Sequence, residues 1–336
     1  TIQKACDMIR EAGRNGAELI VFPETFIPGY PAIYTGGWES KPSEWAPYMI
    51  ALQDNSLLVN SRDTEILGEA AREANTYAVI GCNELDGRPG SRTIYNSLVF
   101  IGRDGKVMGT HRKLMPTYTE RTYWGWGDAS GLKVFDTDIG RIGGLICGEN
   151  MMVLVKAAMM QKGEEFHIAV WPGLWAGHGQ AHIMDPETDP QGAGALIYPI
   201  VRSYACESQA FVLSSHGVLR AKDFPDKWKY LKDSNHTNYS WAIGGSAIIN
   251  PHGRFIAGPL IGEETILYAE CSAHHLKLAK ALFDCLGHYT RWDVARLQVR
   301  TEPWMPEAEM VEKPSVKLPM RELRRISEEH EISLDK

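Results

Sequence analysis

A helical pattern followed by a short apolar run recurs along this chain, and it limits the possible folds more than any other feature. Near the start, apolar residues from Ile2 to Ala12 recur at helical spacing, and the apolar run AELIVFPE follows after a glycine break. The same order returns further along, in ILGEAAREANTYAVIGCNE, LVKAAMMQKGEEFHIAVWP and GALIYPIVRSYACESQAFVLSSH. Such runs are typical of strands buried on both faces, so the sequence predicts an α/β fold with helices outside the sheets.

Hairpin patterns are mixed among these units. SLVFIGRDGKVMGTHRKL predicts two strands around the Asp104–Gly105 turn, and KVFDTDIGRIGGLIC predicts another strand pair. SAIINPHGRFIAGP predicts a further hairpin, and TILYAE at 265–270 predicts one more strand. The mixture favours two sheets over one purely parallel sheet.

The sequence predicts one domain over residues 1–300 and an extended C-terminal tail over residues 301–336. From about Pro303 the chain is rich in Pro, Glu and Lys, which is typical of a tail without its own core. Residues 220–240 are polar and aromatic without clear periodicity and predict an inserted surface loop. The chain opens on a helix where the repeated unit would place a strand, so we expect the first strand to be missing from this sequence.

Composition favours small molecules and copies of the chain itself as partners. The net charge is −7 and no long block of Lys and Arg occurs, so neither a nucleic-acid partner nor a membrane surface is predicted. No apolar run reaches the roughly 18 residues of a membrane-spanning helix, and the charged N-terminal pattern is no signal peptide. The six cysteines are dispersed, so we expect a reducing, cytoplasmic location. His178 and His182 lack a third ligand nearby, so no metal or cofactor is predicted.

The stretch GGLICGENMM places Cys147 at the end of an apolar strand. Free cysteine is among the most buried residue types, so inert core packing is the more common role for such a residue taken alone. The alternative is a nucleophile, because Gly148 follows it with an unobstructed N–H that suits an oxyanion site.

Two other strand ends carry charged residues of types that assist a thiol. Glu24 follows the run LIVFP, where burial would raise its pKa toward the range of a general base; a structural ion pair is an equal alternative. Lys113, in GTHRKLMP, is either a solvated basic residue or a fixed cation that stabilises a thiolate and a tetrahedral adduct. Three suitable residue types at three separate strand ends favour the catalytic alternative.

The motifs VFPETFIPGYP, HRKLMPTYTERTYWGWGD and GGLICGEN resemble the three signatures of the carbon–nitrogen hydrolase superfamily. The continuation ERTYWGWGD and the later stretch LFDCLGHYTRWDVARL are similar to the nitrilase branch in particular. The resemblance extends from residue 1 to about residue 300. It implies a four-layer αββα sandwich that dimerises to αββα–αββα and grows into spirals or filaments.

The resemblance also implies roles for single residues. Glu24 becomes the general base, Lys113 the cation that stabilises the adduct, Cys147 the nucleophile, and Glu120 a second acid that positions substrate or assists proton transfer. A nitrile would be converted through a thioimidate and a thioester to an acid and ammonia, without a metal. An amidase, a nitrile or cyanide hydratase, and a catalytically silent, filament-forming scaffold remain the alternatives.

One departure from the nitrilase pattern concerns the pocket. Nitrilases usually have Trp directly after the cysteine, and this chain has Gly148, so we expect more room beside the thiol and a different size preference. Tyr30, Trp171 and Pro172 are candidate pocket walls, because aromatic residues line apolar ligand sites, although plain core packing is as common for them.

Overall fold

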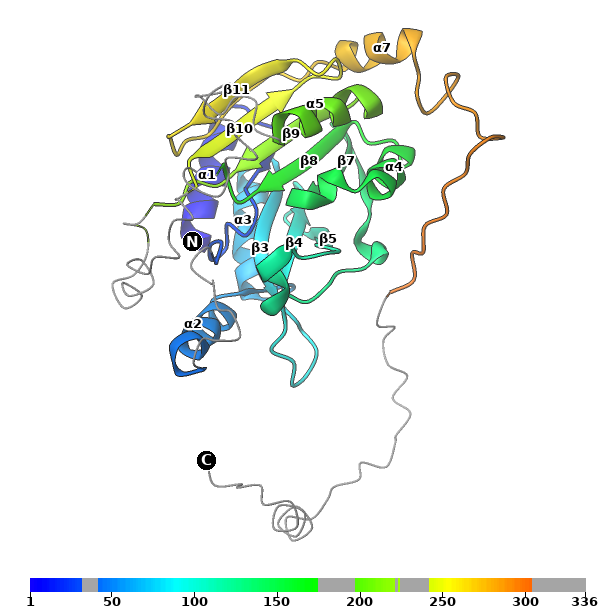
Figure 1. The fold of residues 1–336 in the computed structure, drawn as a ribbon. Helices are drawn as coiled ribbons and strands as arrows, with labels where there is room; N and C mark the ends of the chain where they lie inside the picture. Colours follow the sequence, from blue (N-terminus) through cyan, green and yellow to red (C-terminus); the bar gives the residue numbers. More distant parts are fainter. Residues whose placement is uncertain (32–41, 175–196, 221–222, 224–241, 304–336) are drawn as a thin grey trace, which may run out of the picture. The chain divides into compact units, whose positions relative to one another are not determined.

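The computed structural model describes residues 1–31, 42–174, 197–220, 223 and 242–303 (Figure 1). Within them, Thr1–Glu302 forms a compact unit. Nearly all of the predicted tail and of the predicted 220–240 loop, together with His178 and His182, lie outside the described residues.

The described strands form two sheets, as predicted. The first sheet has the order β1 (Leu19–Val21), β3 (Tyr77–Leu85), β4 (Ile94–Ile101) and β5 (Val107–Arg112), with β2 (Leu57–Leu58) paired to β3. The second has the order β11 (Phe255–Ile261), β10 (Gly244–Ile249), β9 (Phe211–His216), β8 (Phe166–Trp171), β7 (Gly140–Ile146) and β6 (Val134–Thr137). Strands β7, β8 and β9 are parallel, whereas β6, β10 and β11 pair antiparallel to their neighbours.

Six α-helices occur in the described ranges: α1 (Ile2–Arg14), α2 (Pro42–Asp54), α3 (Arg62–Ala74), α4 (Val153–Gln161), α5 (Ile197–Ser208) and α7 (Ala273–Leu282). Local sequence explains their limits where a cap is present. The Ser61 hydroxyl accepts a hydrogen bond from the Asp63 N–H at the start of α3, and Asn75 ends that helix in the left-handed conformation.

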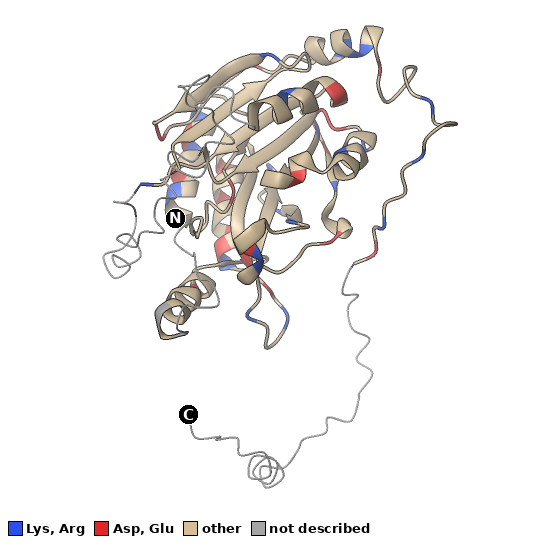
Figure 2. Ribbon diagram, in the orientation of Figure 1, with Lys and Arg blue, Asp and Glu red and all other residues tan. Residues whose placement is uncertain are grey.

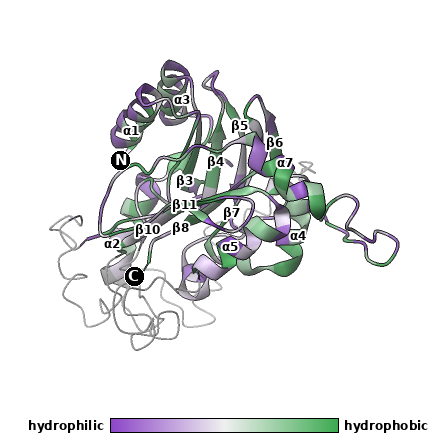
Figure 3. Ribbon diagram, turned by 90° about the horizontal axis from the view of Figure 1, so that it is seen from above, coloured by the Kyte–Doolittle hydropathy of each residue, from purple (hydrophilic) through white to green (hydrophobic). Residues whose placement is uncertain are grey.

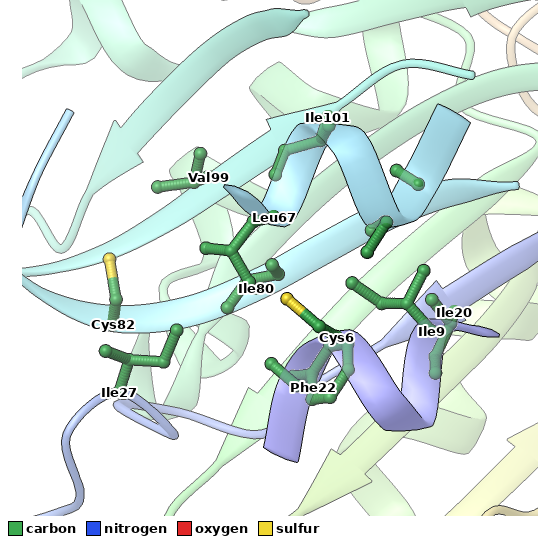
Figure 4. Packing of buried hydrophobic residues seen from close by; sticks show 14 of the residues in the cluster. Cys6, Ile9, Ile20, Phe22, Ile27, Leu67, Ile80, Cys82, Val99 and Ile101 are labelled. Carbon is green, nitrogen blue, oxygen red and sulfur yellow. The ribbon is translucent and has the colours of Figure 1, made fainter. Parts of the chain in front are cut away.

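The two sheets pack face to face between outer helices (Figure 3). Val79 and Leu98 from the first sheet share a buried cluster with Ile146 and Ile168 from the second. On the outer face of the first sheet, α1 and α3 bury apolar side chains against β3 and β4, as Cys6, Leu67 and Ile80 illustrate (Figure 4). Helices α4 and α5 do the same for the second sheet. The layers therefore follow the order helix, sheet, sheet, helix.

The predicted strand at 265–270 is wrong. These residues are irregular, and among the described residues their backbone N–H groups make no backbone hydrogen bond. They border a cavity of about 1160 Å³ whose walls also include β1. A strand needs a neighbouring strand, and none of the described strands lies in register with this segment. The hairpins β4–β5 and β10–β11 and the pair β6–β7 are confirmed.

Lys and Arg are interspersed with Asp and Glu along the described chain (Figure 2). Within the described ranges, each helix is too short or too polar to cross a bilayer.

Candidate active site

The predicted catalytic residues lie where strands of both sheets end. Lys113 directly follows β5 of the first sheet, and its N–H donates to the Asn96 carbonyl at 2.7 Å. Glu24 lies shortly after β1, next to Thr25, whose φ is 48°. Cys147 directly follows β7 of the second sheet. The seam between the sheets therefore brings together side chains that are far apart in sequence.

Lys113 is the central cation of this cluster. Its Nζ donates to Glu24 Oε1 at 2.9 Å and to Glu120 Oε2 at 2.7 Å, and the residue is 1% exposed. Burial lowers the pKa of the ammonium, but Glu24, Cys147 and Glu120 outweigh it and hold the pKa well above its ordinary value. Lys113 is therefore a permanent buried charge rather than a solvated basic residue.

The two carboxylate oxygens of Glu24 differ in their hydrogen bonding. Oε1 accepts from Lys113 and, at 2.6 Å, from Asn96 Nδ2, whereas Oε2 has no hydrogen-bond partner among the described residues. Burial raises the pKa of Glu24 to about 7; Lys113 and Asn96 lower it, and Glu120 raises it. A carboxyl with this pKa exchanges a proton readily near neutral pH.

Glu120 lies in the 3₁₀ helix Tyr118–Thr122 and is held by three donors. Besides Lys113, the Thr117 N–H donates to Oε2 and the Tyr30 hydroxyl donates to Oε1, each at 2.6 Å. Tyr30 therefore contacts the charged cluster itself, and its ring packs edge-on against Trp124. The Tyr30 hydroxyl thereby fixes the orientation of the Glu120 carboxylate.

Cys147 has a φ of 52°, a left-handed conformation that is uncommon for a residue with a side chain and costs on the order of 1–3 kcal/mol. Burial raises the pKa of its thiol well above the ordinary value, and Glu24 adds to this, while Lys113 and the Gly148 N–H oppose it. The thiol is therefore protonated at rest, and a base has to remove its proton when it reacts.

Gly148 has no conformational reason to be glycine. Its φ is not in the left-handed region, and a Cβ at this position would meet only Thr117 Oγ1, at 3.6 Å. A side chain at position 148 would therefore begin in open space, and more room beside the thiol stays a prediction.

The other two expected pocket residues lie at the end of β8. Trp171 is buried, and its indole N–H donates to Ser214 Oγ at 3.1 Å. Pro172 borders the same cavity as Glu24 and Tyr30. Substrate contact by Trp171 and Pro172 stays a prediction.

Asn96 is a site residue that the sequence reasoning missed. It lies within the apolar strand Ile94–Ile101, and an amide buried there is costly unless it is hydrogen-bonded. A polar amide in the middle of an apolar strand is the feature of the sequence that could have identified Asn96. Among the described residues, no group of three His, Cys, Asp or Glu side chains is arranged to hold a metal.

Comparison with known proteins identifies the family of this chain. The profile of the carbon-nitrogen hydrolase family matches residues 1–281. The chain is 36% identical over 299 residues to "Nitrilase 2" of an unknown prokaryotic organism, covering 88% of this chain and 86% of the relative. It is 37% identical over 300 residues to an aliphatic nitrilase of Rhodococcus rhodochrous, covering 88% and 77%.

A solved structure supports the fold. The carbon-nitrogen hydrolase of Helicobacter pylori G27 superposes with a TM-score of 0.65 at 19% identity, covering 87% of this chain and 90% of that one. The resemblance first drawn from three short motifs is thereby confirmed. The chain belongs to the carbon-nitrogen hydrolase family.

Proposed function

We propose that this chain is a nitrilase, which converts an organic nitrile and two waters to a carboxylic acid and ammonia. The single observation that carries the proposal is the buried Lys113 held between Glu24 and Glu120 beside the Cys147 thiol. The names of the relatives, all at more than a third identity over most of the chain, support a nitrile substrate.

In the first half of the reaction, Glu24 takes the thiol proton and the Cys147 sulfur attacks the nitrile carbon. The proton passes to the nitrile nitrogen, so that S–H has added across the C≡N bond and a thioimidate results. Lys113 stabilises the negative charge that develops, because its ammonium is fixed in a buried site where charge interacts strongly.

In the second half, water adds to the thioimidate and gives a tetrahedral species. Loss of ammonia leaves a thioester, and a second water activated by Glu24 releases the acid and restores the thiol. Glu120 holds Lys113 in place and assists the proton transfers. If the thiol leaves the tetrahedral species before ammonia does, the product is an amide, as in a hydratase.

Substrate size is proposed to depend on the open space at Gly148, with Tyr30, Trp171 and Pro172 as further walls. Of these residues, Tyr30 and Pro172 line the cavity of about 1160 Å³. The same proposal includes a cytoplasmic location, because all six cysteines are free thiols, as a reducing compartment would keep them.

Self-association is proposed through the face that begins just after the nucleophile. Met151, Val153 and Leu154 are 50%, 74% and 69% exposed, and exposed apolar residues that adjoin one another mark interaction surfaces. A second copy of the chain is the proposed occupant, which gives an αββα–αββα dimer and a unit for growth into spirals or filaments.

The test is ammonia and product analysis on a panel of aliphatic, aryl and arylacetonitriles. We expect acid and ammonia in equal amounts from the unmodified chain and none from Cys147→Ala. Cys206→Ala is the matched control, because Cys206 is an exposed thiol on α5. Ammonia release that persists in Cys147→Ala would show that Cys147 is not the nucleophile. Accumulation of amide would identify the chain as a hydratase, and activity on amides alone would identify it as an amidase. If neither nitriles nor amides are hydrolysed, the chain is a catalytically silent scaffold.

A further inference from the structure

A buried carboxylate outside the proposed catalytic group joins the two halves of the site. Glu149 is completely buried in the 3₁₀ helix Cys147–Met151. Its Oε1 accepts from the Leu114 N–H at 2.7 Å, and its Oε2 accepts from the Ile146 N–H at 2.7 Å. Leu114 follows Lys113 just after β5 of the first sheet ends, and Ile146, the last residue of β7 in the second sheet, precedes Cys147. One side chain therefore bridges the backbone next to the cation and the backbone next to the nucleophile.

A third donor fixes the orientation of this carboxylate. His111 Nε2 lies 2.8 Å from Glu149 Oε2, and both side chains are buried. Burial raises the pKa of the Glu149 carboxyl, but His111 and the two backbone N–H groups outweigh it, and the pKa lies below its ordinary value. Glu149 is therefore an anion with both oxygens in use, unlike Glu24, and has no spare oxygen for proton transfer.

A second set of hydrogen bonds, from Asn150 to His167, holds Cys147 but does not contact Lys113. Asn150 Nδ2 donates to the Cys147 carbonyl at 3.0 Å, and its Oδ1 lies 2.9 Å from His167 Nε2. His167 in turn contacts Glu164. His167 lies on β8, so these hydrogen bonds fix Cys147 to the second sheet and do not connect it to the first sheet.

We propose that Glu149 is a positioning residue that holds the Lys113 ammonium at its working distance from the Cys147 thiol across the two sheets. The inference rests on the proposed function, since it assigns the alignment of that same site. Both Glu149 oxygens are taken by backbone N–H groups and His111, so its part is to hold the site in place rather than to transfer a proton. A displacement of about 1 Å between catalytic groups is enough to lower a rate by about 100-fold.

The test measures the thiol directly, so it does not depend on the identity of the substrate. Cys147 alkylation by iodoacetamide is followed against pH by mass spectrometry of its peptide, with the exposed Cys206 as internal standard. The groups that face the thiol electrostatically are Glu24, Lys113 and Glu120. Loss of the Glu149 charge alone would lower the pH midpoint of alkylation or leave it unchanged. Loss of alignment with Lys113 would raise the midpoint, so the sign of the shift distinguishes a positioning role from a purely electrostatic one.

For Glu149→Gln we expect an upward shift of the midpoint and a kcat lowered by about 100-fold with little change in KM, because the amide NH₂ opposes one of the backbone donors. Glu149→Asp keeps the charge but is one methylene shorter; it should also shift the midpoint upward, and it decides the matter if Glu149→Gln does not fold. Asp86→Asn is the control for loss of a buried carboxylate elsewhere, with no shift expected.

A midpoint that falls or stays constant in both Glu149 variants would overturn the inference, whatever the substrate proves to be. An upward shift in a chain that hydrolyses no nitrile would retain the positioning role and refute the nitrilase instead.

Discussion

Lys113 Nζ lies 2.9 Å from Glu24 Oε1, so a permanent cation and a carboxyl with a pKa of about 7 share one hydrogen bond away from bulk water. Each group changes what the other can do. Lys113 keeps the Glu24 pKa from rising further, and Glu24 keeps the ammonium charged.

The first prediction concerns pH. Glu24 must be ionised to accept the thiol proton, so kcat/KM should rise with pH through a limb near 7 and fall as pH drops below it. Because the charge of Glu120 raises the Glu24 pKa, Glu120→Gln should move this limb to lower pH. Rates across pH 5 to 9, at about one-unit steps, check both statements; a limb that stays in place in Glu120→Gln would contradict the assignment of Glu24.

The second prediction separates the contribution of Lys113 to stability from its contribution to catalysis. Lys113→Met leaves two buried carboxylates without their cation, which should lower the free energy of unfolding by about 3–5 kcal/mol and abolish most activity. In Lys113→Met/Glu120→Gln, removal of one of the carboxylates should recover part of the stability but none of the activity. Denaturant unfolding and ammonia release measure the two effects. Recovery of activity in the double variant would show that the cation has no chemical role.

The third prediction concerns Gly148. Gly148→Ala should leave Tm unchanged, because its Cβ meets only Thr117 Oγ1 at van der Waals distance. Gly148→Trp should lower kcat/KM for bulky nitriles more than for small ones. The matched control is Gly143→Ala, whose Cβ would lie 2.0 Å from Glu164 Oε1 and should lower Tm by several degrees. Equal losses for bulky and small nitriles in Gly148→Trp would exclude this position as a size filter.

The fourth prediction concerns self-association. A charge placed on the apolar face of α4, as in Leu154→Glu, should reduce the apparent mass in size-exclusion chromatography with light scattering. Ile50→Glu places the same charge on an exposed apolar residue of α2 and should leave the mass unchanged. If both variants behave alike, the interface lies elsewhere or the chain is monomeric.

The sequence predicted those parts of the molecule that depend on local pattern. Glu24 and Lys113 could be predicted as candidates because each places a charge that is costly to bury just after a predicted strand, and Cys147 because it ends an apolar strand next to a glycine. The contacts of Asn96 and Glu149 could not be found, because each joins backbone or side chains from separate strands, and no local pattern records which strands become neighbours. The error at 265–270 has the same origin: its alternation resembles a strand, but pairing depends on a neighbour elsewhere in the chain.

The contacts of Lys113 have a consequence for the energetics of thiol activation. In the proposed mechanism the Cys147 proton moves to Glu24, so negative charge passes from one neighbour of the ammonium to another and the sum of charges around Lys113 is unchanged. No ion has to enter from solvent, so the step avoids the large cost of bringing a bare charge into a medium of low polarity. Activation of the thiol should therefore be nearly independent of ionic strength.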